Sequence, residues 1–270
     1  MNTFEQYKNF TLDELENEFL DAAYNGELEK MKYLLTSPEL KQLVDIETCD
    51  FNGENALHFA ARGGHLEVIK YLLTSNELST HLDVDMESTF SGTAFIIACE
   101  KGHLDIVKYV LNSEELEDHA DINIHDSMAL TLACDRENLE LLKYLISDPE
   151  LNENISLQIR GQETLEISLS LQNYEIAKFL LESNIIHYVP DAYEIIFKNA
   201  YTKNEPEMME YLIFKLDIDK ILGIDEFIAN SNNQSHIITQ IDNMFKLRDL
   251  NQQLNKELSS NNISAKKSKI

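Results

Sequence analysis

Histidine and cysteine side chains are the groups of this 270-residue chain that could ligate a metal ion or act as a base or nucleophile. The eight histidines and three cysteines show no zinc-ligand spacing, no paired-cysteine motif and no His-Glu-x-x-His. The chain also lacks a nucleophile elbow and a phosphate-binding glycine loop. We therefore expect no catalytic residues, no cofactor and no metal, and predict that the protein is not an enzyme. A small catalytic domain in residues 217–258 is the alternative, although this segment offers no convincing set of acid, base and nucleophile.

Three of the histidines, His58, His65 and His103, occupy fixed positions in a unit that the chain repeats. Its clearest copy is residues 53–73, GENALHFAARGGHLEVIKYLL. The apolar spacing predicts two short helices, and the glycine pair between them allows the chain to reverse within a few residues. Because neither helix is long enough to be stable alone, the unit must stack against copies of itself.

Six copies share one internal spacing: each has a small residue, a turn residue four positions later and an aromatic residue seven positions after that. Aligned across the copies, these positions form three columns. The period between copies runs 38, 38, 35, 35 and 32 residues, so the helices are fixed and the connectors vary. The small column is Ala22, Ala60, Ala98, Ala133, Ser168 and Ala200; the turn column is Gly26, Gly64, Gly102, Glu137, Gln172 and Asn204; the aromatic column is Tyr33, Tyr71, Tyr109, Tyr144, Phe179 and Tyr211.

These residues resemble the ankyrin repeat family over roughly residues 12–216. Residues 55–61, NALHFAA, are similar to the family's T-P-L-H-x-A-A segment, and residues 64–73, GHLEVIKYLL, to its second helix. The third copy, at residues 92–111, matches nearly as well, whereas copies one and four are weaker and copies five and six weaker still. The resemblance implies an all-α fold: an ankyrin-repeat α-solenoid of about six helix-turn-helix repeats with short finger hairpins and a C-terminal capping helix.

The sequence divides into an N-terminal cap (1–15), the array (16–216), a helical C-terminal cap (217–258) and a polar, disordered tail (259–270). Thr11 and Glu14 have the spacing of a capping box at a helix start. Residues 235–258 predict a helix with one apolar face, which caps the last repeat or, alternatively, forms a dimer or partner contact. A Ser-x-Glu-Leu insert follows the second helices of copies one to three, and copy four has the varied form Ser-Asp-Pro-Glu-Leu at residues 147–151. This insert predicts a short extra helical piece in each copy.

Cysteine and tyrosine columns are predicted to be structural. Cys99 and Cys134 take the place of Ala61, where a thiol packs as a small apolar group, and Cys49 lies in a connector. This usage is typical of a reducing, cytoplasmic compartment, in the producing cell or in a host cell. The column tyrosines are expected to pack between repeats with their hydroxyls toward solvent.

Residues for binding a partner follow from the resemblance, because the family grips partners with finger tips and the exposed end of the first helix. Exposed aromatic and arginine side chains dominate interface energies. Phe51 and Phe90 are the exception to an otherwise polar finger sequence, and the alternative is that they pin neighbouring fingers together. The predicted binding residues are Tyr24, Phe51, Asn52, Glu54, Arg62, Phe90, Glu100, Lys101, His125, Asp135, Arg136 and Arg160. By the fixed repeat spacing, His125 and Arg160 take the finger positions of copies four and five.

The formal charge of −26 disfavours nucleic acid and anionic membranes as partners and favours a protein with a basic or mixed surface. No run of residues has the length and apolarity of a membrane span, and residues 1–8 lack the apolar region of a secretory signal. We expect a monomeric protein-protein interaction scaffold, with a dimer through residues 235–258 as the alternative. Low glycine and proline with many Asn, Lys and Ile is similar to ankyrin effectors of intracellular bacteria. The alternative function is an acidic immunity or inhibitor protein that masks a basic partner in the producing cell.

Overall fold

The computed structural model describes residues 5–148, 151, 157–183, 192–215, 239, 243–254 and 256. These residues fall into two compact units, Met1–Ile167 and Ser168–Ile270. The all-α fold class is confirmed: the described residues are helical hairpins joined by loops, with two isolated bridges, Cys49–Asn55 and Ser88–Gly92, as their β-structure.

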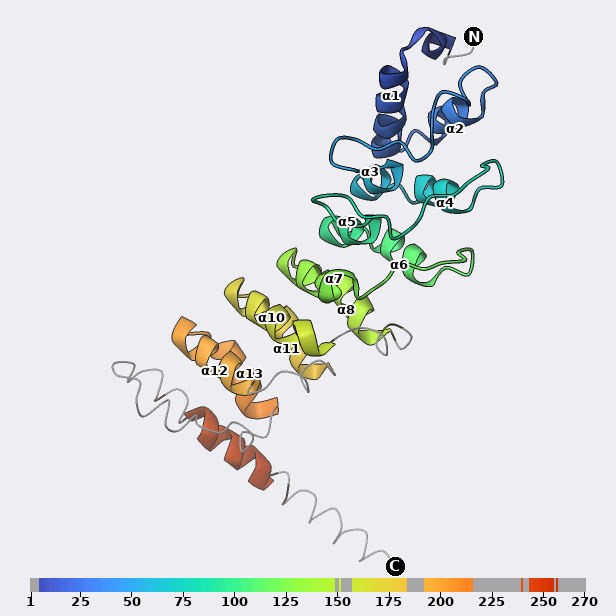
Figure 1. Ribbon diagram of the computed structural model, residues 1–270. Coiled ribbons are helices and arrows are strands. Elements are labelled where there is room, and N and C mark those ends of the chain that lie inside the picture. The colour runs from blue at the N-terminus through green and yellow to red at the C-terminus, as the bar shows by residue number, and fades with distance from the viewer. Residues whose placement is uncertain are drawn as a thin grey trace, which may run out of the picture. The chain divides into compact units, whose positions relative to one another are not determined.

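The first unit opens with a 3₁₀ helix, η1 (Glu5–Asn9), followed by four helical hairpins (Figure 1). The capping box at the start of α1 is confirmed, since Thr11 Oγ1 accepts from the Glu14 amide at 3.3 Å and Glu14 Oε2 accepts from the Thr11 amide at 2.8 Å. The hairpins are α1 (Leu12–Asn25) with α2 (Leu28–Thr36), α3 (Ala56–Gly63) with α4 (Leu66–Thr74), α5 (Ala94–Lys101) with α6 (Leu104–Asn112), and α7 (Ile124–Asp135) with α8 (Leu139–Ser147).

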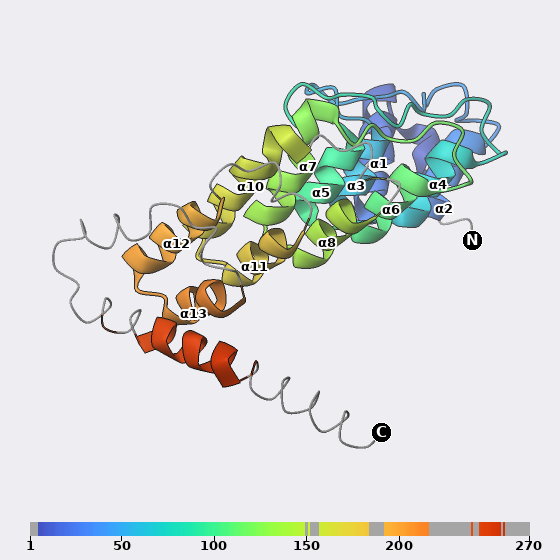
Figure 2. The same cartoon turned by 90° about the horizontal axis from the view of Figure 1, so that it is seen from below.

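Stacking of the first helices is confirmed within this unit, where α1 packs on α3, α3 on α5 and α5 on α7 (Figure 1). The small residues Ala22, Ala60, Ala98 and Ala133 are fully buried at these contacts. Turn glycines such as Gly64 adopt the left-handed backbone, with φ of 78°, and end the first helix of their hairpin. The loops between hairpins lie together along one side of the helices (Figure 2).

The helix α10 (Leu157–Ser170) begins in the first unit and ends in the second, which also contains α11 (Tyr174–Glu182), α12 (Ala192–Lys203) and α13 (Pro206–Lys215). Pro206 opens α13, as the sequence predicted. Residues 243–254 are helical, and Leu247, Leu250 and Leu254 there are half-exposed. Because most of residues 217–242 and all of 257–270 lie outside the described residues, the C-terminal cap, the dimer contact and the disordered tail stay predictions.

The prediction of an extra helical piece after each second helix is wrong for copies two and three. Residues 75–80 and 113–118 form isolated turns, in each of which one serine carbonyl accepts a single turn hydrogen bond, from Leu78 and Leu116 respectively. A histidine six residues after each serine, His81 or His119, places its Nε2 3.0 Å from the same serine carbonyl. Copy one continues through consecutive turns over residues 38–43. The corresponding insert of copy four lies partly outside the described residues.

Histidine and tyrosine columns join consecutive repeats. His65 Nε2 donates to the Tyr24 carbonyl at 2.9 Å, and His103 Nε2 to the Arg62 carbonyl at 3.4 Å. Lys32, Lys70 and Lys108 each lie over the column tyrosine of the following repeat, with Nζ 5.2–5.6 Å from the ring centroids of Tyr71, Tyr109 and Tyr144. The expectation of solvent-facing hydroxyls is wrong for Tyr71 and Tyr109, whose hydroxyl oxygens are buried. Burial raises the pKa of Tyr71 to about 12.

Candidate functional site

Two tight turns carry the predicted aromatic contact residues. We call residues 49–55 finger A and residues 88–92 finger B; each is closed by one isolated bridge. Asp50 organises finger A because its Oδ1 accepts the amides of Asn52 and Glu54, both at 2.8 Å. Gly53 supplies the left-handed φ of 76° that this turn requires.

Finger B is closed in a similar way by Ser88, whose amide donates to the Gly92 carbonyl at 2.9 Å. Its Oγ accepts from the Ser91 amide at 3.1 Å. The Thr89 amide then donates to the Asn52 carbonyl at 2.9 Å, so the two fingers are joined through their backbones. This link holds the two tips in a fixed register without using the side chain of Phe51 or Phe90.

Phe51 and Phe90 protrude from these tips into solvent. The exposed fraction is 96% for Phe51 and 82% for Phe90, the two highest values among the exposed large apolar side chains of the described residues. The alternative that the two rings pin neighbouring fingers together is therefore wrong, since rings in mutual packing would be largely covered. The rings are available to a partner.

A buried network ties the fingers to the helices behind them. Asn55 caps α3 by accepting the amides of Leu57 and His58, at 3.0 and 3.3 Å. The backbone amide of Asn55 donates to His58 Nδ1 at 3.2 Å, and His58 Nε2 donates to the Gly92 carbonyl of finger B at 3.0 Å. Both ring nitrogens are thereby used by the neutral imidazole. Burial lowers the pKa of His58, partly offset by the Gly92 carbonyl.

Glu54 and Arg62, both predicted to contact a partner, form an ion pair with each other. The guanidinium donates two parallel hydrogen bonds, Nη1 to Oε2 at 2.7 Å and Nη2 to Oε1 at 2.6 Å. Ser91 of finger B contacts both side chains. The guanidinium holds the pKa of Glu54 below its ordinary value. Glu54 is buried, so its predicted place on an open binding surface is wrong.

The fingers predicted for copies four and five are absent from the described residues. In both copies the first helix, α7 or α10, begins earlier in the sequence and occupies the positions at which a finger would turn. Asn55 in copy two and Thr93 in copy three stop their helices as N-caps. The same column holds Met128 in copy four and Glu163 in copy five, and neither helix is stopped there. Predicted finger residues His125 and Arg160 therefore lie on helices.

The remaining predicted residues lie at or near the ends of first helices, and most of the charged ones are paired locally. Arg136 Nη2 is 3.0 Å from Glu100 Oε1, and Lys101 Nζ is 3.3 Å from the same oxygen. Arg160 pairs with Glu163 and donates to the His125 carbonyl at 3.3 Å. Residues Tyr24, His125, Asp135 and Arg136 are exposed, and Asn52 is half-buried.

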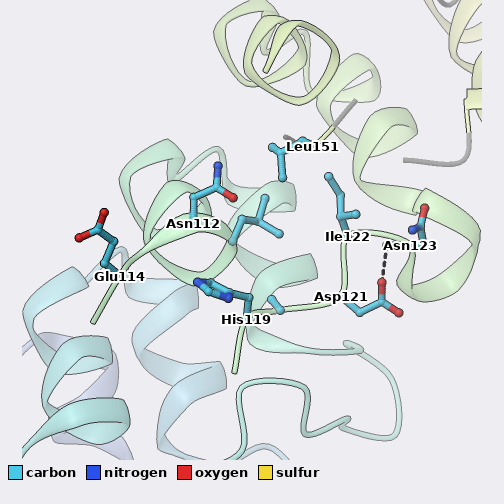
Figure 3. A pocket seen from close by; sticks show the side chains of 9 residues that line it. Asn112, Glu114, His119, Asp121, Ile122, Asn123 and Leu151 are labelled. Atoms are coloured by element: carbon cyan, nitrogen blue, oxygen red, sulfur yellow. Dashed lines mark hydrogen bonds between the residues drawn. The ribbon is translucent and has the colours of Figure 1, made fainter. Parts of the chain in front are cut away.

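A hollow of about 480 Å³ between the third and fourth hairpins shows no catalytic arrangement (Figure 3). His119 is engaged with the Ser113 carbonyl, and Asp121 Oδ1 accepts the Asn123 amide at 2.8 Å. Across the described part of the chain, no three His, Cys, Asp or Glu side chains are grouped to hold a metal ion. None of the helices described there combines the length and apolarity of a bilayer span.

A family model described as ankyrin repeats, with three copies, matches residues 19–126. The chain contains ankyrin repeats. No curated protein matches it. The match begins within α1 and runs through α6 and both fingers to the first residues of α7.

The hairpin turn geometry continues past the matched residues without a turn glycine. Glu137, Gln172 and Asn204 occupy the glycine column and keep its left-handed backbone, with φ of 54°, 58° and 59°. The His81 and His119 links to the loop serines were missed by sequence reasoning. Their equal spacing of six residues after Ser75 and Ser113 is the signal that could have revealed them.

Proposed function

We propose that this chain is a non-enzymatic interaction protein that binds another folded protein through fingers A and B and the neighbouring ends of the first helices. Ankyrin repeats are protein-protein interaction modules, which supports the general class. The observation that carries the proposal is the exposure of Phe51 and Phe90 on two turns that are hydrogen-bonded to each other. Because the backbones of the two turns are already fixed against each other, presenting these rings to a partner costs little backbone entropy.

The other exposed residues of this surface would form a polar rim. Tyr24 adds a third partly exposed aromatic ring at the end of α1. Arg136 and Glu100 form an exposed pair that can exchange partners at small cost, because such pairs contribute little to stability. Rim contacts of this kind set orientation and association rate more than affinity.

Affinity capture from cell extract, with mass spectrometry of the bound proteins, tests this function. The bait is the full chain, compared with a Phe51→Ala/Phe90→Ala double variant. A matched control changes Leu12 and Leu43, which are 48% and 49% exposed but lie outside the fingers, to alanine. We expect specific partners on the wild type and the control, and their loss from the finger variant. Equal capture by all three baits would contradict the site assignment.

For the biological setting, we propose a bacterial effector that acts in a host cell, on the compositional similarity alone. A reporter fusion of the full chain, compared with one lacking residues 259–270, tests delivery. Absence of reporter signal from the full-length fusion would reject the effector role. An inhibitor that masks a basic partner in the producing cell is the second candidate, favoured by the charge of −26, and it requires association that weakens strongly with salt.

A further inference from the structure

The negative charge of the chain is concentrated in the loops of the first unit. We define the loop layer as residues 37–55, 75–93 and 113–123, which include both fingers and the segments leading to them. These residues contain 14 acidic side chains and one cation, Lys41, a net charge of −13. The whole chain carries −26, so half of the net charge lies in 49 of 270 residues.

The helices beside this layer carry cations that are locally balanced. On the second helices, Lys70 lies 3.2 Å from Glu67 and Lys143 lies 3.2 Å from Glu140. On the first helices, Arg136 pairs with Glu100, whereas Arg62 reaches into the loop layer and pairs with Glu54. Apart from α1, which carries five acids and no cation, the helical surface therefore presents alternating signs at short range. The loop layer keeps a negative excess beyond its pairs Glu54–Arg62 and Glu39–Lys8.

The electrostatic environment within the layer is consistent with this excess. Burial raises the pKa of Asp85, and the neighbouring carboxylates of Asp83, Asp121 and Asp118 raise it further. The Asp85 carboxylate accepts the Asp121 amide at 3.1 Å, which offsets part of the effect. The loops are thus held together at a place where an approaching cation would lower the electrostatic energy.

Phe51 and Phe90 protrude from this negative layer. A partner that covers the two rings would therefore also face the acidic side chains of the layer. Resting on the proposed function, we propose that the loop layer docks an amphipathic, Lys- or Arg-rich segment of another protein. Its apolar side chains would cover the two rings, and its cations would face exposed acids such as Glu47 and Glu87. The same negative field disfavours nucleic acid and anionic lipid, because their phosphates would be repelled.

Fluorescence anisotropy with three labelled 20-residue peptides tests the proposal on the full chain. One probe alternates Leu and Lys, the second Ser and Lys, and the third Leu and Glu. We expect the Leu/Lys probe to bind at least tenfold more tightly than the Ser/Lys probe, and no binding of the Leu/Glu probe. Vesicles of anionic phospholipid and a single-stranded RNA serve as further probes, and binding of either would contradict the proposal.

Two variants separate the apolar and the charged contributions. Phe51→Ala/Phe90→Ala should weaken the Leu/Lys probe at least tenfold and leave the Ser/Lys probe unchanged. Neutralising the exposed loop residues Glu47, Glu87 and Glu117 to glutamine should weaken both cationic probes several-fold. The matched control changes Glu29, Glu67 and Glu140 to glutamine; these residues carry the same total charge but lie on second helices. This control removes the same total charge and should have little effect.

The outcomes distinguish this inference from the proposed function. Equal loss of binding in the loop and helix charge variants would show that net charge alone determines the affinity for the cationic probes. That result would overturn the inference. Wild-type affinity of the Phe51→Ala/Phe90→Ala variant for the Leu/Lys probe would overturn it as well. If affinity capture nevertheless yields a partner that depends on the first-helix ends, the interaction function stands without this partner chemistry.

Discussion

At the scale of single residues, the contrast between Phe51 and Phe95 separates an exposed aromatic side chain from one that packs in the core. Phe51 is 96% exposed and Phe95 is fully buried in α5. Phe51→Ala and Phe90→Ala should each change the free energy of unfolding by less than about 0.5 kcal/mol, whereas Phe95→Ala should lower it by about 3–5 kcal/mol. Urea denaturation measures all three. A loss above about 1 kcal/mol for either finger variant would mean that its ring packs within the chain.

The Glu54–Arg62 pair predicts that breaking a buried ion pair lowers the free energy of unfolding more than breaking an exposed one. Arg62→Met leaves the buried Glu54 carboxylate without its bidentate partner and should lower the free energy of unfolding by about 2–3 kcal/mol. Arg136→Met removes one of the two exposed partners of Glu100 and should cost less than about 1 kcal/mol. Chemical denaturation of both variants in the same buffer makes the comparison. Equal losses would contradict the role given to burial.

His58 predicts a pH dependence of stability. Since burial lowers its pKa in the folded chain, the unfolded chain takes up the proton first as the pH falls through about 6.5. The stability associated with neutral His58 is thus present above that pH and is lost on acidification, at a slope of up to about 1.4 kcal/mol per pH unit. His58→Gln should flatten the slope between pH 7 and 5.

Phe51→Ala provides the control for that measurement, because its exposed ring carries no titratable group. This variant should retain the wild-type slope. Identical slopes for wild type and His58→Gln would show that the buried network tolerates a charged imidazole.

At the scale of elements, the turn column of the hairpins predicts a stabilising substitution. Glu137 ends α7 with a φ of 54°, a conformation that costs a side-chain-bearing residue about 1 kcal/mol relative to glycine. Glu137→Gly should therefore raise the free energy of unfolding by about 1 kcal/mol. Glu140→Gly, in the exposed first turn of α8, should lower it by a similar amount. Thermal unfolding of the pair tests this, and a loss in both would contradict it.

The helical hairpins could be predicted from the sequence because their determinants are local. Small residues in the Ala60 column allow close helix contacts, and a turn residue four positions later ends the helix. The exposure of Phe51 and Phe90 was also predictable, since an apolar residue in a polar turn has no apolar neighbour to pack against.

Features that depend on a missing cap or on long-range contacts were harder to predict. The fixed repeat spacing predicted fingers in copies four and five. Met128 and Glu163 replace the N-cap residues there, and the helices continue through these positions. The Glu54–Arg62 pair joins two predicted binding residues eight positions apart, on a turn and a helix end. Their mutual contact depends on how finger A folds back, which spacing alone does not specify.

At the scale of the whole molecule, charge is segregated more sharply than the composition indicates. The net charge of −26 would suggest a uniformly acidic surface, yet the loop layer carries −13 and α1 carries −5, while helices such as α4 and α8 carry local pairs. Such a distribution favours association with a cationic surface in one orientation. Under the proposed function, it would also disfavour anionic partners at the two exposed rings.

Hydrogen–deuterium exchange on the full chain, with and without the first captured partner, tests the central claim that partners are gripped by the fingers of the loop layer. We predict slowed exchange in residues 45–55 and 83–93, with little change in α4, α6 and α8. Protection confined to those second helices, with unchanged exchange in both fingers, would contradict the account.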